Sequence, residues 1–171
     1  FSLLPVRDYK GCSIVGGGGA LGIAAAYAAE SFGMAVPRLR EDLQAAILKA
    51  LPKPGSSAVN PIDIANPFVP PQTIHEALLR ASEDENVDLH IVILLLFHYK
   101  ALKFILGAGN LREVVPNREL VKACRDAMDI GKKPVVIVMP NLKQEEDSID
   151  VEEIIRETRR LFTEAGMPVY D

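Results

Sequence analysis

Short apolar runs recur along the chain and alternate with segments that have the hydrophobic spacing of helices. The runs are continuous rather than alternating in polarity, which is typical of strands buried on both faces of a sheet. The predicted strands are residues 11–15, 34–36, 87–97, 134–139 and 167–170. The predicted helices are residues 20–32, 40–50, 71–84, 117–130 and 150–165.

Helix stop signals support this assignment. Gly33, Gly131 and Gly166 each stand where a left-handed residue would end a helix, and residues 132–134 and 167–168 then begin strands. Strands and helices that alternate with short turns predict a three-layer α/β fold, in which a mostly parallel, doubly wound sheet has about five strands.

Two segments interrupt the alternation. Residues 51–70 contain five prolines, which disfavour a helix and predict a structured loop. Residues 97–116 form a long link between a strand and the next helix. We expect this link to be disordered or buried against a neighbouring copy, because its apolar side chains would otherwise form an exposed patch. They are Tyr99, Leu102, Phe104, Ile105 and Leu106, and their spacing also permits the alternative of a short helix folded onto its own sheet.

Composition narrows the class of protein. A chain of 171 residues is expected to form a single domain. A net charge of -4 gives no reason to expect nucleic acid or an anionic membrane as a partner, because both select clustered Lys and Arg. Cys12 and Cys124 have no metal-ligand spacing, so no metal site is expected and both thiols are predicted to be reduced and buried.

The termini and the apolar runs bear on location. The longest apolar run, residues 91–97, is too short to span a bilayer, and the N-terminus lacks a signal-peptide pattern, so a cytoplasmic protein is expected. The chain starts at Phe1 and stops directly after a predicted strand. Because parallel strands are normally covered on both faces, we expect a fragment of a longer multidomain chain.

The most distinctive stretch is a glycine run at the mouth of an alanine-rich helix. The turn after the first strand of a doubly wound sheet is the commonest phosphate site, because N–H groups and the helix dipole face the ligand there. We therefore predict an anion site at Gly16, Gly17, Gly18, Gly19 and Ala20. The run has no Lys, Ser or Thr, which excludes a Walker A loop and makes FMN binding unexpected.

A dinucleotide-binding domain remains the rival interpretation of this run. Residues 17–22 match the Gly-x-Gly-x-x-Gly fingerprint, and NAD or NADP binding would also need an acid about 20 residues later. The chain has Val36, Pro37 and Arg38 there, and Glu41 only afterwards. A purely structural role, a tight turn with close helix packing, explains Gly22 better than it explains the four glycines before it.

Other polar residues are weaker candidates. His75 is predicted to lie on a solvated helix face and His90 in the core, whereas His98 follows the third predicted strand and is the only histidine placed for catalysis. Asn60 and Asp63 lie in the proline-rich loop and are expected beside the glycine turn, where they could meet a partner domain or close an Asx turn. Glu83, Asp84, Glu85 and Asp88 are assigned to a solvated helix end.

An ordered set of segments resembles a known enzyme family. The set comprises residues 18–33 (GGALGIAAAYAAESFG), 59–63 (VNPID), 81–88, 131–136 (GKKPVV) and 164–170 (EAGMPVY). It resembles the NDP-forming acyl-CoA synthetases, and more narrowly their third, flavodoxin-like domain, which is related to the carboxyl-terminal domain of the succinyl-CoA synthetase beta subunit. The resemblance covers nearly the whole chain apart from residues 97–116.

The resemblance implies a part in a thiokinase reaction. In that family acyl-CoA, ADP and phosphate interconvert with acid, CoA and ATP through an acyl phosphate and a phosphohistidine. Two helices from similar domains point their N-termini at the phosphohistidine, and the helix that begins near Gly19 would be one of them. The family usually has Gly-Gly-Pro-Gly where this chain has Gly19, Ala20, Leu21 and Gly22.

The resemblance also implies what this chain lacks. The phosphorylated histidine of the family lies in another domain, and none of the three histidines here has its Ser-His-Thr-Gly context. The chain alone would be inactive and bind no cofactor, while the parent enzyme would use CoA, ADP or ATP, and Mg. Its partners would be a CoA-binding and phosphohistidine domain and an ATP-grasp domain or subunit. A homodimer and a non-catalytic interaction or regulatory domain stay open.

Overall fold

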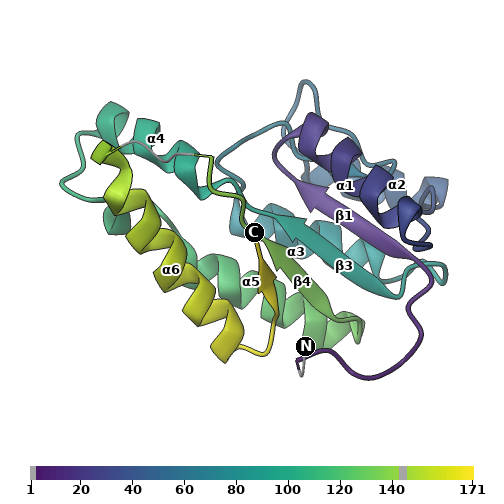
Figure 1. Cartoon of the computed structure of the whole chain (residues 1–171). Coiled ribbons are helices and arrows are strands. Elements are labelled where there is room, and N and C mark those ends of the chain that lie inside the picture. Colours follow the sequence, from purple (N-terminus) through teal and green to yellow (C-terminus); the bar gives the residue numbers. More distant parts are fainter. Residues whose placement is uncertain (1–2, 143–145) are drawn as a thin grey trace.

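The computed structural model describes residues 3–142 and 146–171 and contains a five-stranded parallel sheet (Figure 1). The sheet order is β2-β1-β3-β4-β5, so the chain winds first to one side of β1 and then to the other. This confirms the predicted doubly wound α/β fold. The strands are β1 (Cys12–Gly16), β2 (Ile62–Asp63), β3 (Leu89–Ile93), β4 (Val135–Val138) and β5 (Val169–Tyr170).

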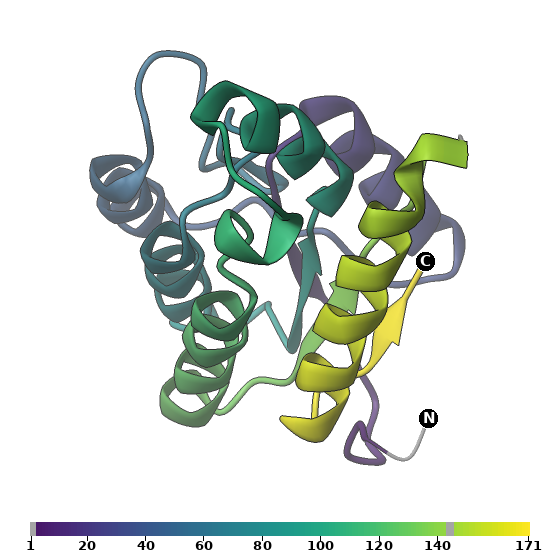
Figure 2. The same ribbon diagram turned by 90° about the vertical axis from the view of Figure 1, so that its left-hand side faces the viewer.

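Helices pack on both faces of the sheet. The helix α1 lies on one face, and α3 and α5 lie on the other (Figure 1). Figure 2 shows α5 and α6 side by side, with α4 near one end of α6. The helices are α1 (Gly19–Ser31), α2 (Glu41–Ala50), α3 (Pro71–Ala81), α4 (Tyr99–Leu106), α5 (Asn117–Gly131) and α6 (Ile149–Glu164), with short 3-10 turns η1 (Leu96–His98), η2 (Leu111–Glu113) and η3 (Glu146–Ser148).

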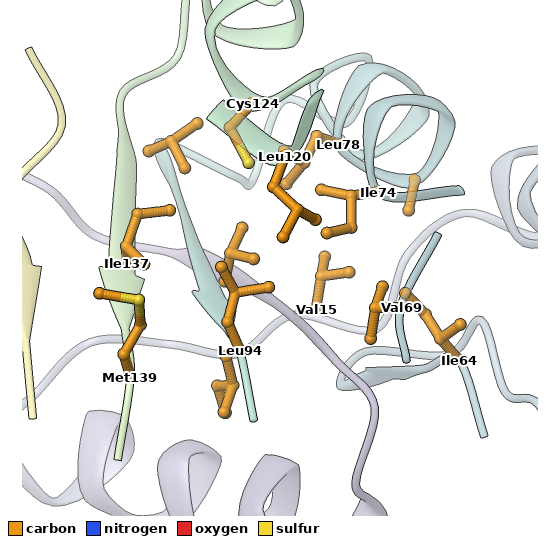
Figure 3. Packing of buried hydrophobic residues seen from close by; sticks show 14 of the residues in the cluster. Val15, Ile64, Val69, Ile74, Leu78, Leu94, Leu120, Cys124, Ile137 and Met139 are labelled. Carbon is orange, nitrogen blue, oxygen red and sulfur yellow. The ribbon is translucent and has the colours of Figure 1, made fainter. Parts of the chain in front are cut away.

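The main hydrophobic core lies between the sheet and the pair α3 and α5 (Figure 3). The register pairs Val15 with Val92 and Val92 with Ile137, so these three side chains share a face of the sheet. All three are fully buried. They pack against Ile74 and Leu78 of α3 and Leu120 and Cys124 of α5.

The strand predicted at residues 34–36 is wrong. Ala35 makes a single bridge to Gly11, and the strand next to β1 is instead Ile62–Asp63 in the proline-rich loop. Asn60 accounts for this change of neighbouring strand, since its side-chain Oδ1 accepts a hydrogen bond from the Ile14 N–H at 2.9 Å. Its Nδ2 donates to the carbonyls of Cys12 at 3.0 Å and Pro37 at 2.9 Å. One buried amide side chain thus occupies the edge of β1 before β2 begins.

The long link folds as α4 between the 3-10 turns η1 and η2 rather than as a disordered segment. Tyr99 is 4% exposed and Leu102 is half-buried against the core, as the short-helix alternative requires. Phe104, Ile105 and Leu106 at the end of α4 are 72%, 76% and 63% exposed. The expected apolar patch therefore exists, but it is confined to these last three residues.

His90 is a core residue, and both of its ring nitrogens have hydrogen-bond partners, as predicted. Its Nδ1 lies 2.6 Å from the Ser13 hydroxyl and its Nε2 lies 2.9 Å from the Ser82 hydroxyl. Burial, together with the nearby Lys133 charge, lowers the pKa of His90 to about 3. The imidazole is therefore neutral in the folded protein at physiological pH.

Two of the three glycine caps are confirmed. Gly33 and Gly166 have φ angles of 82° and 83°, whereas the left-handed residue after α5 is Lys132, with φ 57°. Gly131 is instead the last helical residue, and a Cβ there would lie 2.3 Å from the Ser82 hydroxyl. The glycine at position 131 is therefore required by the close approach of α5 to Ser82, and not by its backbone angles.

The acidic run is only partly a solvated helix end. Glu83 and Glu85 are exposed, but Asp84 is 1% exposed and accepts hydrogen bonds from the N–H groups of Arg40 and Asn86. Burial opposes ionisation of Asp84, and these hydrogen bonds hold its pKa below its usual range. Asp88 accepts from the N–H groups of Lys10 and Gly11, which also lowers its pKa. Both carboxylates therefore form hydrogen bonds to segments that are distant in the sequence.

The two thiols are free and buried, as expected. Burial raises the pKa of Cys12 to about 11, with a contribution from the charge of Glu30, and that of Cys124 to about 12. Among residues 3–142 and 146–171, no helix combines the length and apolar character needed to cross a membrane.

Candidate functional site

The glycine run lies where β1 ends and α1 begins. Gly18 is the N-cap of α1 in an extended conformation, and its carbonyl accepts the first helical hydrogen bond, from the Gly22 N–H at 3.0 Å. Within the described part of the chain, no hydrogen bond uses the N–H groups of Gly17, Gly18 or Gly19. These three consecutive amides lie at the positive end of the α1 dipole, so they can donate to an anion. We call Gly17, Gly18 and Gly19 the amide cradle.

Close packing against backbone and core atoms accounts for Gly16 and Gly17, and Gly19 lies against the end of a carboxylate side chain. A Cβ on Gly17 would lie 2.2 Å from the Asn66 carbonyl oxygen, and one on Gly16 would lie 3.1 Å from the Ile93 Cβ. A Cβ on Gly19 would lie 2.8 Å from Asp63 Oδ2. Any side chain at these positions would force neighbouring atoms to move.

Gly18 is different from its neighbours. A Cβ there would meet only a Leu95 methyl carbon, at an ordinary contact distance of 3.5 Å. Its φ of -155° is open to any residue. Neither packing nor backbone conformation therefore requires glycine at position 18, which leaves access to the amides as the physical reason that the structure offers.

Asp63 brings a carboxylate to the cradle. It is the last residue of β2, and its Oδ1 accepts a hydrogen bond from the Ala65 N–H at 2.9 Å, which is the Asx turn considered from the sequence. Its Oδ2 lies on the side of Gly19. The expected proximity of Asp63 to the glycine turn is therefore present, whereas Asn60 bonds to the edge of β1 instead of closing an Asx turn.

A cavity of about 330 Å³ opens beside the start of α1. Its lining is mainly apolar, with Asp63 as the ionisable group. The residues that line it include Gly18, Gly19, Gly22, Ile23, Pro61 and Asp63. The cavity joins the cradle to the β2 loop, so a ligand that enters it would meet amides and a carboxylate together.

The remaining candidates lie elsewhere. His98 is half-buried in η1 with its ring 4.3 Å from that of Phe97, and the contact with Gly18 comes from Leu95, three residues earlier. Ala20 is exposed in the first turn of α1. His75 is not on a solvated face, because its side chain is only 18% exposed and borders a groove between α3 and α5.

The chemistry of the cradle is that of binding and orientation. Three amides and a helix dipole can stabilise negative charge, but they cannot transfer a proton or attack a substrate. Across residues 3–142 and 146–171, no group of three His, Cys, Asp or Glu side chains could hold a metal ion. Sequence patterns did not point to Leu95 or to the Asn66 carbonyl, because both reach the turn only through the tertiary fold.

Comparison with solved structures shows a shared fold. The apo form of the dinucleotide forming acetyl-coenzyme A synthetase 1 of Ca. Korarchaeum cryptofilum matches 99% of this chain, with a TM-score of 0.68 and 20% identity. The same enzyme in complex with phosphate and ADP matches 96%, with a TM-score of 0.60 and 20% identity. PH0766 from Pyrococcus horikoshii OT3 also matches 96%, with a TM-score of 0.69 and 21% identity.

The matches cover 31%, 33% and 32% of those chains, so this chain spans about a third of their length. Two of the three are structures of one acetyl-coenzyme A synthetase, within the type of enzyme that the sequence resembles. No protein-family model matches the chain, and no curated protein matches it in sequence.

Proposed function

We propose that this chain is a domain of an NDP-forming acyl-CoA synthetase, in which the amide cradle receives a phosphoryl group carried on a histidine of another domain. The parent enzyme would interconvert acyl-CoA, ADP and phosphate with acid, CoA and ATP. CoA, ADP or ATP, and Mg would bind to its other parts, namely a CoA-binding and phosphohistidine domain and an ATP-grasp domain or subunit. His98 is not needed for this role.

One observation carries the proposal: three consecutive amides at the start of α1 have no hydrogen-bond acceptor among the described residues, and Gly18 among them is not required by packing. Amides and a dipole suffice for a ligand that arrives on another domain, since its binding energy comes mainly from that domain. The shared fold with two acetyl-coenzyme A synthetase structures supports the assignment.

Asp63 makes the cradle a weak site for any anion, which a phosphoryl group carried on another domain can tolerate because the contacts of that domain hold it in place. The Asp63 carboxylate lies beside Gly19 and repels an additional anion, which weakens the cradle for inorganic phosphate in solution. Weak affinity suits a group that must leave again for the next step. A lysine at this position would hold the phosphoryl group and slow its departure.

The test is an NMR titration of the labelled chain with inorganic phosphate and with a short phosphohistidine peptide. We expect both ligands to shift the amide signals of Gly17, Gly18 and Gly19, with millimolar affinity for phosphate, about 4 kcal/mol of binding free energy. Gly18→Val should abolish the shifts while the fold is retained. Gly109→Ala is the matched control, because Gly109 lies in a distant turn where a Cβ would meet only the flexible end of Glu113.

One structural observation favours the alternative of an NAD(P)-binding domain. Asp63 ends the strand next to β1 and lies beside the glycine run, which is the place where a dinucleotide-binding domain holds the ribose hydroxyls. From the sequence this acid was sought about 20 residues after the run, but the loop before β2 places it farther along the chain. A ribose-binding carboxylate at Asp63 is therefore the second candidate.

Asp63→Asn separates the two candidates. Removing the negative charge should raise phosphate affinity about fivefold, since a charge this close is worth roughly 1 kcal/mol at a partly solvated site. If Asp63 holds a ribose, the same change should weaken NADH binding and leave phosphate unaffected. Wild-type protein whose cradle signals move with NADH and not with phosphate would refute the phosphoryl role.

A further inference from the structure

We propose that Asp63 is a positioning residue, whose free carboxylate oxygen accepts a hydrogen bond from the ring N–H of the phosphohistidine that enters the amide cradle. The site then takes this group in its ring-protonated form, which carries both negative and positive charge. The inference rests on the phosphoryl role proposed above, and it gives Asp63 a part in that role beyond the repulsion of free anions.

One oxygen of Asp63 is bonded and the other is free. Its Oδ1 accepts a hydrogen bond from the Ala65 N–H at 2.9 Å, and its backbone forms two hydrogen bonds with that of Ser57, both at 2.9 Å. These contacts fix the position of the carboxylate. Across residues 3–142 and 146–171, Oδ2 accepts no hydrogen bond, and it lies 2.8 Å from the place that a Cβ on Gly19 would occupy. A preorganised acceptor therefore stands next to the first residue of α1.

The cavity beside α1 consequently has two different ends. The amide cradle attracts negative charge, whereas Asp63 attracts positive charge and N–H donors. The walls are mainly apolar and include Ile23 and Pro61. Asn60 adds no free group, because its amide is already bonded at the edge of β1. A purely anionic ligand gains from the amides and loses to Asp63, but a ligand that joins an anion to a cationic N–H gains from both.

A phosphohistidine has this arrangement. Phosphorylation occupies one ring nitrogen, and the other remains basic, since an imidazole nitrogen titrates near pH 6.5. When protonated, that nitrogen presents a cationic N–H close to the phosphoryl group. The faces of the ring are largely apolar, as are the walls of the cavity. Inorganic phosphate and the phosphates of a nucleotide have no such N–H, so Asp63 distinguishes a phosphohistidine from these anions.

The hydrogen bond also favours the form from which the phosphoryl group leaves. In the transfer to the acid, the P–N bond breaks and a P–O bond forms to a carboxylate oxygen. A ring that is protonated at its other nitrogen departs as neutral imidazole, whereas an unprotonated ring would have to depart as an anion. The proton stays throughout on the nitrogen that faces Asp63, so the step needs no other acid.

Asp63 dominates the electrostatics of this contact. It is the only ionisable group among the residues that line the cavity. The strand β1 has no charged residue, and Glu30, the only charged residue of α1, lies in the last turn of that helix. Lys53, in the loop before β2, does not line the cavity. A change in the charge of Asp63 should therefore alter the protonation of a bound ring, whereas the same change at Glu30 should not.

The experiment measures the affinity of the chain for a short phosphohistidine peptide at about pH 6 and about pH 9, on either side of the ring titration. The phosphorus and ring-proton NMR signals of the peptide report binding. We expect the wild type to bind about tenfold more tightly at the lower pH, which corresponds to a rise of about one unit in the ring pKa.

Asp63→Asn should reduce this ratio to below about twofold. Asparagine keeps the Oδ1 bond to the Ala65 N–H, so the fold is retained, but it turns an N–H group toward the ring in place of an acceptor. Glu30→Gln is the matched control, because it removes the same charge from the exposed far end of α1. It should keep the wild-type ratio.

The direction of the Asp63→Asn effect separates this inference from the phosphoryl role itself. At about pH 6 the substitution should weaken binding of the peptide and strengthen binding of inorganic phosphate, opposite effects that a merely structural role would not produce. If it strengthens both, Asp63 only repels anions, so the inference is overturned and the phosphoryl role stands. A wild-type affinity that is equal at both pH values, or a ratio lost in Glu30→Gln as well, also overturns it. If neither ligand binds the wild type, both proposals fail.

Discussion

Neighbouring residues of β4 have opposite surroundings. Val135 and Ile137 point toward α3, α5 and α6 and are fully buried, whereas Val136 and Val138 point toward the side of α1 and are half-buried. The closed face therefore carries most of the burial that stabilises the fold. The open face has room for contacts with other molecules, and the amide cradle lies at its edge.

The largest expected difference between the faces is in core truncation. Ile137→Ala should lower the free energy of unfolding by about 3 kcal/mol, because the closed packing around it cannot collapse into the cavity. Val138→Ala, the next residue on the open face, should cost about 1 kcal/mol or less in dilute solution. Urea unfolding of both variants measures this, and equal costs would contradict the division of the sheet into a closed and an open face.

Acid should weaken the closed face through His90. The unfolded histidine has a pKa near 6.5 and the folded one about 3, so below pH 6.5 the unfolded state gains a proton that the folded state does not. Stability is therefore lost as pH falls, by about 2 kcal/mol between pH 7.5 and pH 5. His90→Gln should remove this part of the pH dependence in urea titrations, whereas His75→Gln should keep it. An unchanged pH profile in His90→Gln would refute the assignment.

Two glycine-to-alanine changes sharpen the comparison. Gly131→Ala should cost about 1–2 kcal/mol, because the new methyl group would displace the Ser82 hydroxyl from His90, in spite of better helix propensity. Gly18→Ala should change stability by less than about 0.5 kcal/mol, since its Cβ meets only an ordinary contact. Thermal unfolding of both variants measures these changes in stability. A large loss of stability in Gly18→Ala would mean that packing does require that glycine.

The smallest effect is expected on the outer face of α1. Tyr27→Gln should leave the unfolding free energy of the monomer within about 0.5 kcal/mol of the wild type, because the side chain is 76% exposed. The measurement is urea unfolding at about 1 µM protein. A loss of more than about 1 kcal/mol would show that the Tyr27 side chain contributes to the packing of the fold in spite of its exposure.

Much of the fold was predictable because its signals are local. Continuous apolar runs located β1, β3, β4 and β5, although the run predicted as a strand over residues 87–97 forms β3 only to Ile93 and then enters the turn η1. The helices next to these strands lie within a few residues of their predicted bounds. The strand β2 was missed because two residues have no periodicity, and because Asn60 takes over the pairing at the β1 edge from 46 residues away. No sequence window contains that information.

The candidate site was predictable only in part. The glycine run by itself predicts where the site lies, since consecutive glycines before a helix have few structural uses. The contacts that distinguish Gly18 from Gly17 come from Leu95 and Asn66, which are separated from the turn in the sequence. The assignment of Asp84 failed for the same reason, because its hydrogen-bond partner Arg40 lies 44 residues away.

The side chain of Asn60 has a consequence for local unfolding. Its hydrogen bonds to Ile14, Cys12 and Pro37 span 46, 48 and 23 residues, so one amide group closes a long loop that contains all of α1 and α2. When these bonds open together, the loop loses its side-chain hydrogen bonds to the edge of β1, while the packing of α3, α5 and α6 does not depend on them. We expect the segment from Gly17 to Asn60 to exchange its amide hydrogens as one cooperative unit, at a lower free energy than the rest of the molecule.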